Sequence, residues 1–371
     1  MRLEHQQARQ PAHPVNVGDS SAPLYFVRHA GTLQSSGFEV ERYRLTAARQ
    51  IGALPVLGLW ALLTLAGALF ANWYGYGGRS FAALLTAGAF FLLVMLLFAA
   101  RGIPEFLTGA LGAGSGFLLG VFGYFVYIVY AVGTGSFSYA RAGAIAGFVF
   151  VPLALAASAE RKAAGAWQDY LTLALIWVCV KFGPTHWVWP YPGGHLAYVY
   201  TVILAVTVAI AAFLLIRHVD KTGYSIAWGP RWTVFVLGSF LVFAAIAIPL
   251  GRALHFIAFD PLWYKWPAWP ATFLTILLFT AWPEEFLFRG LLQNFLQRSA
   301  KSDFAGWCSA SILFGFSHIT NLGFPNWRYV LLASIAGLFY GWTWRKTGSI
   351  FASALVHAGV DATWHFFFRT L

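Results

Sequence analysis

Residues 269–298 read WPATFLTILLFTAWPEEFLFRGLLQNFLQR, an apolar stretch with two adjacent carboxylates at its centre. A helix needs about 20 apolar residues to cross the hydrocarbon core of a membrane. Each carboxylate placed near the middle of such a helix costs about 2.5–3.5 kcal/mol of insertion free energy. The stretch therefore predicts a membrane helix whose acidic residues have either a buried partner or a function.

The composition also predicts a membrane protein. Hydrophobic residues make up 59% of the 371 positions and charged residues 10%, against about 45–50% and about 25% in soluble domains. We therefore expect an all-α polytopic membrane protein of about eleven transmembrane helices, with a C-terminal four-helix catalytic core. The predicted spans lie near residues 51–72, 81–100, 107–132, 142–158, 168–182, 197–216, 232–256, 269–298, 303–319, 327–345 and 349–369.

Three regions follow from this pattern. Residues 1–50 form a polar tail, residues 51–260 form N-terminal transmembrane helices of unknown role, and residues 261–371 form the core that carries the chemistry. Placing the tail inside puts more than twice as many Lys and Arg residues on that side as on the other, so we predict a cytoplasmic N-terminus. We expect a multi-pass protein of a bacterial inner membrane. Its net charge of +11 reflects basic loops, and we expect no nucleic-acid partner.

The two central carboxylates differ in their expected partners. Glu285 and Arg289 are four residues apart and share a helix face, so they can neutralise each other. Glu284 lies about 100° round the helix and has no such partner, which leaves it free for proton chemistry. A salt bridge that joins two helices is the structural alternative for this motif. Pro283 lacks a backbone donor and can kink the helix just before the pair.

Two later segments carry histidines at helical spacing. Phe314 and His318 share a face, although a single histidine at a helix end is also typical of an interface residue. His357 and Asp361 share a face of the last segment, where the carboxylate can orient the imidazole. His365 continues their stripe. Polar groups on one face of a membrane helix are expected to face protein or water.

Taken in order, these residues resemble the CPBP family of membrane proteins. That family includes type II CAAX prenyl endopeptidases and bacteriocin-processing or immunity proteins. Its EExxxR, FxxxH and Hxxx(N/D) motifs are similar to Glu284-Glu285-Arg289, Phe314-His318 and His357-Asp361, and the likeness covers about the last 110 residues.

The resemblance implies an intramembrane endopeptidase that acts on a membrane-anchored or lipidated peptide or protein. Glu284 would be the general base that activates water, assisted by His318, while Glu285 and Arg289 order the site. His357 and Asp361 would stabilise the oxyanion. A desolvated carboxylate is a competent base and an imidazole can donate to an oxyanion, so elementary chemistry agrees with these roles.

Asp361 departs from the pattern, because the prenyl endopeptidases usually carry Asn there. An ionised Asp cannot donate a hydrogen bond to an oxyanion. Either Asp361 is protonated, or it orients His357 and leaves that histidine as the sole donor, or the activity is altered.

Several alternatives remain at this stage. The family's mechanism implies no cofactor, but Glu284, His318 and His357 are also plausible ligands for a divalent metal. A non-catalytic scaffold or immunity protein with the same fold is one alternative function, and a polytopic transporter is another. The sequence leaves the oligomeric state open.

Overall fold

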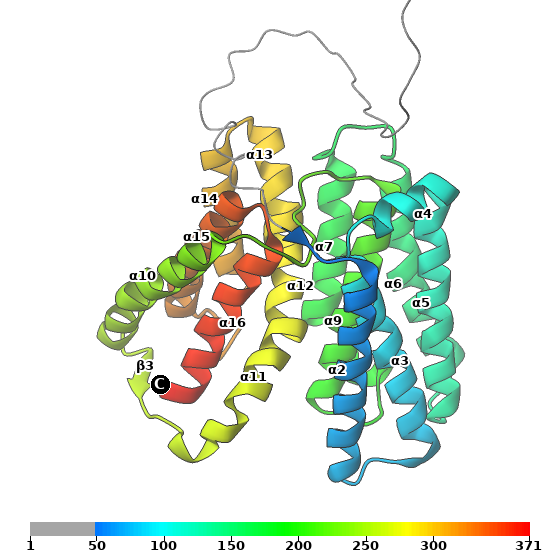
Figure 1. Ribbon diagram of the computed structural model, residues 1–371, viewed down its shortest axis with the longest axis horizontal. Coiled ribbons are helices and arrows are strands. Elements are labelled where there is room, and N and C mark those ends of the chain that lie inside the picture. Colours follow the sequence, from blue (N-terminus) through cyan, green and yellow to red (C-terminus); the bar gives the residue numbers. More distant parts are fainter. Residues whose placement is uncertain (1–48) are drawn as a thin grey trace, which may run out of the picture. The chain divides into compact units, whose positions relative to one another are not determined.

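Helices make up most of residues 49–371, the part of the chain that the computed structural model describes (Figure 1). The first helices are α2 (Ala53–Trp73), α3 (Gly78–Leu97), α4 (Ile103–Leu111), α5 (Gly114–Gly133), α6 (Tyr139–Ala157), α7 (Trp167–Phe182), α8 (Thr185–Val188) and α9 (His195–Ala209), which continues into the π-helical segment η1 (Ile210–Ile216). The later helical elements are α10 (Trp232–Ala253), the 3-10 helix η2 (Trp263–Ala268), α11 (Trp269–Ile276), the π-helical η3 (Leu277–Ala281), α12 (Trp282–Glu285), the π-helical η4 (Phe286–Gln293), α13 (Asn294–Ala300), α14 (Asp303–Phe316), α15 (Trp327–Thr347) and α16 (Ile350–Phe367).

Two short antiparallel strand pairs complete the described residues. β1 (Arg49–Gln50) pairs with β2 (Ala227–Trp228), and β3 (Ile257–Phe259) pairs with β4 (Phe368–Thr370). The predicted tail of residues 1–50 lies outside the described residues except for the two residues of β1.

Seven helices among the described residues are long and apolar enough to cross a membrane, so the protein is an integral multi-pass membrane protein. The predicted number of about eleven spans is wrong. The seven are Ala53–Trp73, Gly78–Leu97, Gly114–Gly133, Tyr139–Ala157, His195–Ile216, Trp232–Ala253 and Trp263–Ala300.

Four predicted spans, which correspond to α7, α14, α15 and α16, are too short or too polar to count as membrane-spanning helices. α7 has 16 residues and α14 has 14, fewer than the roughly 20 that a span needs. α15 ends in Arg345 and Lys346, and α16 carries His357 and Asp361, so their mean hydropathy is lower. The polar side chains of α15 and α16 need protein or water around them.

The long helix Trp263–Ala300 changes its winding around the two central carboxylates. The π-helical segments η3 and η4 lie directly before and after α12, the short α-helical turn that contains Pro283, Glu284 and Glu285. Pro283 cannot donate a backbone hydrogen bond, which favours a local irregularity. Wide π-turns re-aim the side chains that follow and often occur at functional sites.

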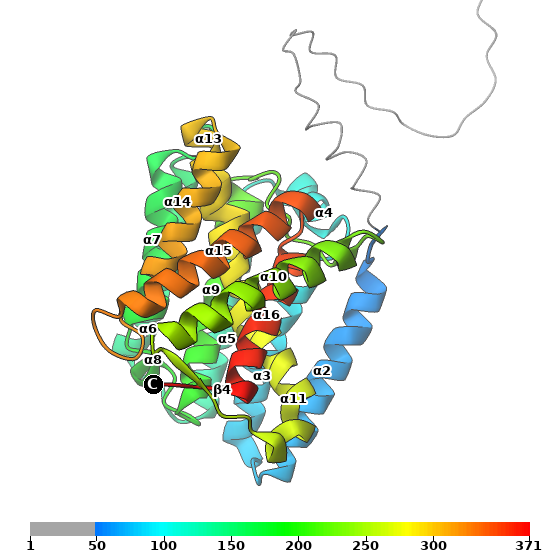
Figure 2. The ribbon, with the colours of Figure 1, turned by 90° about the vertical axis from the view of Figure 1, so that its left-hand side faces the viewer.

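The C-terminal helices surround α16. α10, α11, α12 and α15 all pack against it, and α15 in turn packs against α14 and α10 (Figure 2). Gly337 of α15 lies in the interface with α14, where a Cβ atom on this residue would approach the Cα of Ser311 to 3.0 Å. α10 precedes the domain boundary predicted at residue 260 yet belongs to this packing. That boundary stays a prediction.

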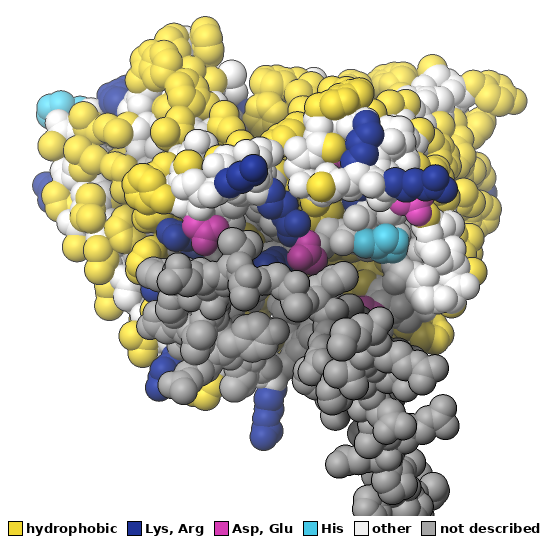
Figure 3. Space-filling model, turned by 90° about the horizontal axis from the view of Figure 1, so that it is seen from above, with side chains coloured by type: hydrophobic (Ala, Val, Ile, Leu, Met, Phe, Trp, Pro, Cys, Tyr) yellow, Lys and Arg dark blue, Asp and Glu magenta, His cyan; other side chains and the backbone are white. Residues whose placement is uncertain are grey.

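Basic side chains gather on the face that carries α13 and α4, while hydrophobic side chains cover much of the surrounding surface (Figure 3). On α13, Arg298 forms an exposed ion pair with Asp220. A basic face of this kind is typical of the cytoplasmic side of a membrane protein. The cytoplasmic N-terminus stays a prediction, because the tail lies outside the described residues.

Candidate active site

Glu285 joins three elements at the centre of the C-terminal helices. Its side chain is fully buried, with Oε2 lying 3.2 Å from Nε of Arg289 on η4. The same oxygen accepts a hydrogen bond of 2.6 Å from the Ser353 hydroxyl of α16, and Oε1 lies 2.9 Å from Nδ1 of His357. Both carboxylate oxygens of Glu285 therefore have partners, and the side chain is placed to hold the site together.

Arg289 is held on two aromatic rings as well as on Glu285. Its guanidinium carbon lies 4.3 Å from the ring centre of Phe314 and 5.3 Å from that of Tyr340. Such cation–π contacts contribute about 2 kcal/mol when they are desolvated. The Phe314 ring also lies 4.8 Å from the His318 ring, so the aromatic residue of the FxxxH motif packs between the arginine and a site histidine.

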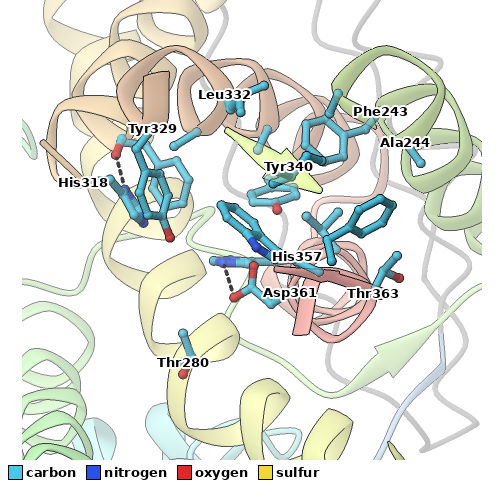
Figure 4. Close-up of a pocket in the computed structure, with 18 of the residues that line it drawn as sticks. Phe243, Ala244, Thr280, His318, Tyr329, Leu332, Tyr340, His357, Asp361 and Thr363 are labelled. Atoms are coloured by element: carbon cyan, nitrogen blue, oxygen red, sulfur yellow. Dashed lines mark hydrogen bonds and ion pairs between the residues drawn. The ribbon is translucent and has the colours of Figure 1, made fainter. Parts of the chain in front are cut away.

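The two nitrogens of His357 face different partners. Nδ1 faces Glu285, and the ring stacks on Tyr340 with centres 4.5 Å apart. Nε2 lies 3.5 Å from Asp361 Oδ2 and 3.9 Å from Glu284 Oε2. Figure 4 shows His357 and Asp361 projecting together from α16. Asp361 was expected to orient the imidazole, but Glu285 makes the closer contact and does so at the opposite nitrogen.

Glu284 differs from its neighbour in having an unsatisfied oxygen. Its Oε2 atom is buried, and no described residue makes a hydrogen bond to it. An unpartnered buried acceptor costs about 1–3 kcal/mol, and more when it is charged. The side chain is 25% exposed, and it lines the cavity described below. Glu284 is therefore positioned to accept a hydrogen bond from water or from a substrate.

His318 lies just beyond the end of α14, with one nitrogen occupied. Its Nδ1 lies 2.8 Å from the carbonyl oxygen of Phe314 and 3.0 Å from the hydroxyl oxygen of Ser317. Because a carbonyl oxygen can only accept a hydrogen bond, this contact requires that Nδ1 carries the proton and donates to it. Nε2 then remains as the nitrogen that can exchange a proton with another group.

A cavity of about 290 Å³ brings the four proposed catalytic side chains together. Glu284, His318, His357 and Asp361 all line it, along with aromatic residues of α10, α15 and α16. Figure 4 shows His318, His357 and Asp361 in this cavity, with Phe243 of α10 and Tyr329 and Tyr340 of α15. His365, the last member of the predicted stripe, is exposed and is not among the lining residues. The lining combines these polar side chains with many apolar ones, as is usual for ligand-binding cavities.

A second cavity, of about 580 Å³, adjoins the same side chains from the side of α7 and α9. Glu284 and His318 line both cavities, and Lys181, His195 and Tyr198 of the N-terminal helices line the second. The N-terminal helices thus contribute directly to the surroundings of Glu284.

The alternative of a metal site concerns Glu284, His318 and His357. Among residues 49–371, no group of three His, Cys, Asp or Glu side chains is arranged to hold a metal ion. Glu284 and His357 are near each other, whereas Nδ1 of His357 and Nδ1 of His318 both face groups of the protein.

Sequence reasoning missed three side chains around the site. Ser353 lies four residues before His357, so the helical stripe could have revealed it. Tyr340 follows Gly337 on α15 and carries no motif of its own. Lys181 belongs to an N-terminal helix in which nothing indicated chemistry, and only the tertiary structure brings it to the cavity.

Fold and site together define a multi-pass membrane protein in which carboxylates and histidines converge on an internal cavity. Residues 265–363 match the model of a family described as type II CAAX prenyl endopeptidase Rce1-like. This match confirms the resemblance that the three motifs indicate, and it implies that the protein is a peptidase. No curated protein and no solved structure gives a significant match to the chain.

Proposed function

We propose that the protein is an intramembrane endopeptidase that hydrolyses a peptide bond of a membrane-anchored substrate with water activated by Glu284. One observation carries the proposal: of two adjacent carboxylates, Glu285 has hydrogen-bond partners on both oxygens, whereas Oε2 of Glu284 has none among the described residues and the Glu284 side chain, 25% exposed, lines the cavity. These different environments suit the two carboxylates to different tasks. The paired carboxylate orders the site and the unpaired one is available as a base.

The proposed reaction begins with a water molecule held between Glu284 and His318. Glu284 takes one proton from the water while the water oxygen attacks the carbonyl carbon of the peptide bond. The carbonyl π electrons move to oxygen, and the resulting oxyanion accepts a hydrogen bond from Nε2–H of His357. Collapse of the tetrahedral intermediate re-forms the carbonyl and breaks the C–N bond, and the leaving amine takes the proton from Glu284.

Glu285 acts in this scheme as a positioning residue. With Nδ1 of His357 fixed at 2.9 Å from Glu285 Oε1, the ring presents Nε2 to the cavity. Donation from Nε2 requires a proton on this nitrogen. If Nδ1 also donates to Glu285, the imidazole ring is protonated on both nitrogens and is positively charged, and the neighbouring carboxylates favour that charged form. The proposed oxyanion donor is therefore oriented by Glu285 and stacked in place by Tyr340.

The substrate can be sought by comparing membrane proteomes of cells that make the wild-type protein or the Glu284→Ala variant. We expect a membrane-anchored peptide that persists only with the variant, because cleavage requires the carboxylate. If the variant instead supports the full biological phenotype and no peptide accumulates, the protein acts as a non-catalytic scaffold.

Replacement of Asp361 by Asn is expected to preserve or raise peptidase activity. An amide donates a hydrogen bond that an ionised carboxylate cannot, and it keeps nearly the same shape beside Nε2 of His357. The measurement is kcat/KM of the purified variant on the accumulated peptide. A complete loss of activity in this nearly isosteric variant would show that the carboxylate itself is needed.

A further inference from the structure

Among the described residues that line the two cavities at the site, Lys181 is the only Lys or Arg. It lies at the C-terminal end of α7, far from the motifs in sequence and outside the matched residues 265–363. Its side chain is partly buried in the wall of the larger cavity, which Glu284 and His318 also line. A positive charge therefore stands in the same enclosed space as the proposed base.

The ammonium group of Lys181 has a neutral partner rather than an acidic one. Nζ donates a hydrogen bond of 2.5 Å to Oδ1 of Asn321, which lies three residues after His318. Among residues 49–371, no carboxylate lies within ion-pair distance of Nζ, and no other acceptor receives a hydrogen bond from it. Since an ammonium group has three N–H donors, two remain for a ligand.

This arrangement is costly unless an anion completes it. A charge that is taken partly out of water without an opposite charge loses solvation free energy. Lys181 and Glu284 form no direct ion pair, and Nζ of Lys181 donates to Asn321 instead. The cavity of about 580 Å³ is thus lined by both the proposed base and a cation that does not pair with it.

We propose that Lys181 binds a carboxylate of the substrate peptide and thereby fixes which peptide bond reaches Glu284. The proposal rests on the peptidase function proposed above and adds a specificity-determining residue from the N-terminal helices. The carboxylate is either the C-terminus of the peptide or an acidic side chain. Both present the same two oxygens to the ammonium group, and the experiment separates them.

The test uses the full-length protein in liposomes and N-terminally palmitoylated peptide libraries of one length. One library has free C-termini, a second has C-terminal amides, and each is made with and without Asp and Glu. Mass spectrometry gives the relative kcat/KM of each class. We expect wild-type protein to prefer a carboxylate-bearing class by about tenfold to hundredfold, the range of a hydrogen bond to a charged group.

The Lys181→Met variant should lose that preference, with a ratio near one, and Lys181→Arg should keep part of it. Lys265→Met is the matched control, because Lys265 is exposed and lines neither cavity. Its ratio should equal that of the wild type. Preference for free C-termini identifies the terminal carboxylate, and preference for Asp and Glu identifies a side chain. An equal fall of Lys181→Met activity on all classes would overturn the proposal.

Binding provides a second measurement that does not depend on turnover. The Glu284→Gln protein should bind the carboxylate-bearing peptides about tenfold or more tightly than the neutral ones, and adding Lys181→Met should remove the difference. Equal binding of acids and amides would contradict the role of Lys181. Continued cleavage by Glu284→Gln would instead contradict the proposed function, so the two failures are distinguishable.

Discussion

Replacement of Glu284 by Gln is expected to lower kcat/KM by about 10²–10⁴-fold, the contribution of a general base in a hydrolase. Glutamine has the same size as glutamate, but its amide cannot take a proton from water. Because Oε2 of Glu284 has no hydrogen-bond partner among the described residues, removing its charge breaks no hydrogen bond of the fold and weakens only the 3.9 Å contact with Nε2 of His357. The measurement is cleavage of the accumulated peptide by the purified protein, together with its thermal unfolding.

Glu105→Gln is the matched control for this variant. Glu105 lies in the first turn of α4, is exposed, and lines neither cavity at the site. It should change neither activity nor unfolding. A Glu284→Gln protein that is folded and retains more than about a tenth of wild-type activity would show that another group activates the water, since loss of a base is expected to cost more than that.

The contrast between Glu284 and Glu285 shows how neighbouring residues of one type acquire different tasks. Helical geometry points them in different directions, and the π-helical segments on either side of α12 adjust those directions further. Glu285 meets a hydroxyl, a guanidinium and an imidazole, whereas Glu284 meets the cavity. The cost of burying two charges is thus met by protein contacts for one and is left to water or substrate for the other.

Local spacing predicted part of this arrangement. The pair formed by Glu285 and Arg289 follows from four-residue spacing, and the structure contains it. The contact between Glu285 and His357 joins residues 72 positions apart, so no local pattern could reveal it. For the same reason the sequence could not identify Lys181, which reaches the cavity only because α7 packs against η4 and α9.

Hydropathy predicted the membrane class of the fold correctly and the number of spans incorrectly. The additional predicted spans were α7, α14, α15 and α16, which are short or polar. Their sequences are apolar enough to be predicted as membrane spans. Their short length or polar faces, however, suit helices that pack against other helices. His357 and Asp361, which reduce the hydropathy of α16, also line the site.

Replacement of Arg289 by Met is expected to destabilise the protein by about 3–5 kcal/mol, the cost of breaking one side of a buried ion pair. Arg289 is 1% exposed, so its loss leaves the buried carboxylate of Glu285 without its cation and removes the contacts with Phe314 and Tyr340. Reversible unfolding in detergent micelles measures the free energy. Arg328→Met is the control, because Arg328 is exposed and forms no ion pair among the described residues; it donates to the backbone carbonyls of Leu254 and His255 and lies 6.0 Å from the ring centre of Phe256.

A double variant separates stability from chemistry. Glu285→Met with Arg289→Met removes both buried charges, and such replacements are often neutral or stabilising. We expect it to recover most of the lost unfolding free energy and yet to stay inactive, since His357 then lacks the carboxylate that faces its Nδ1 atom. Recovery of activity along with stability would mean that Glu285 only offsets the charge of Arg289. Stability without activity would mean that Glu285 orients the histidine that is proposed to stabilise the oxyanion.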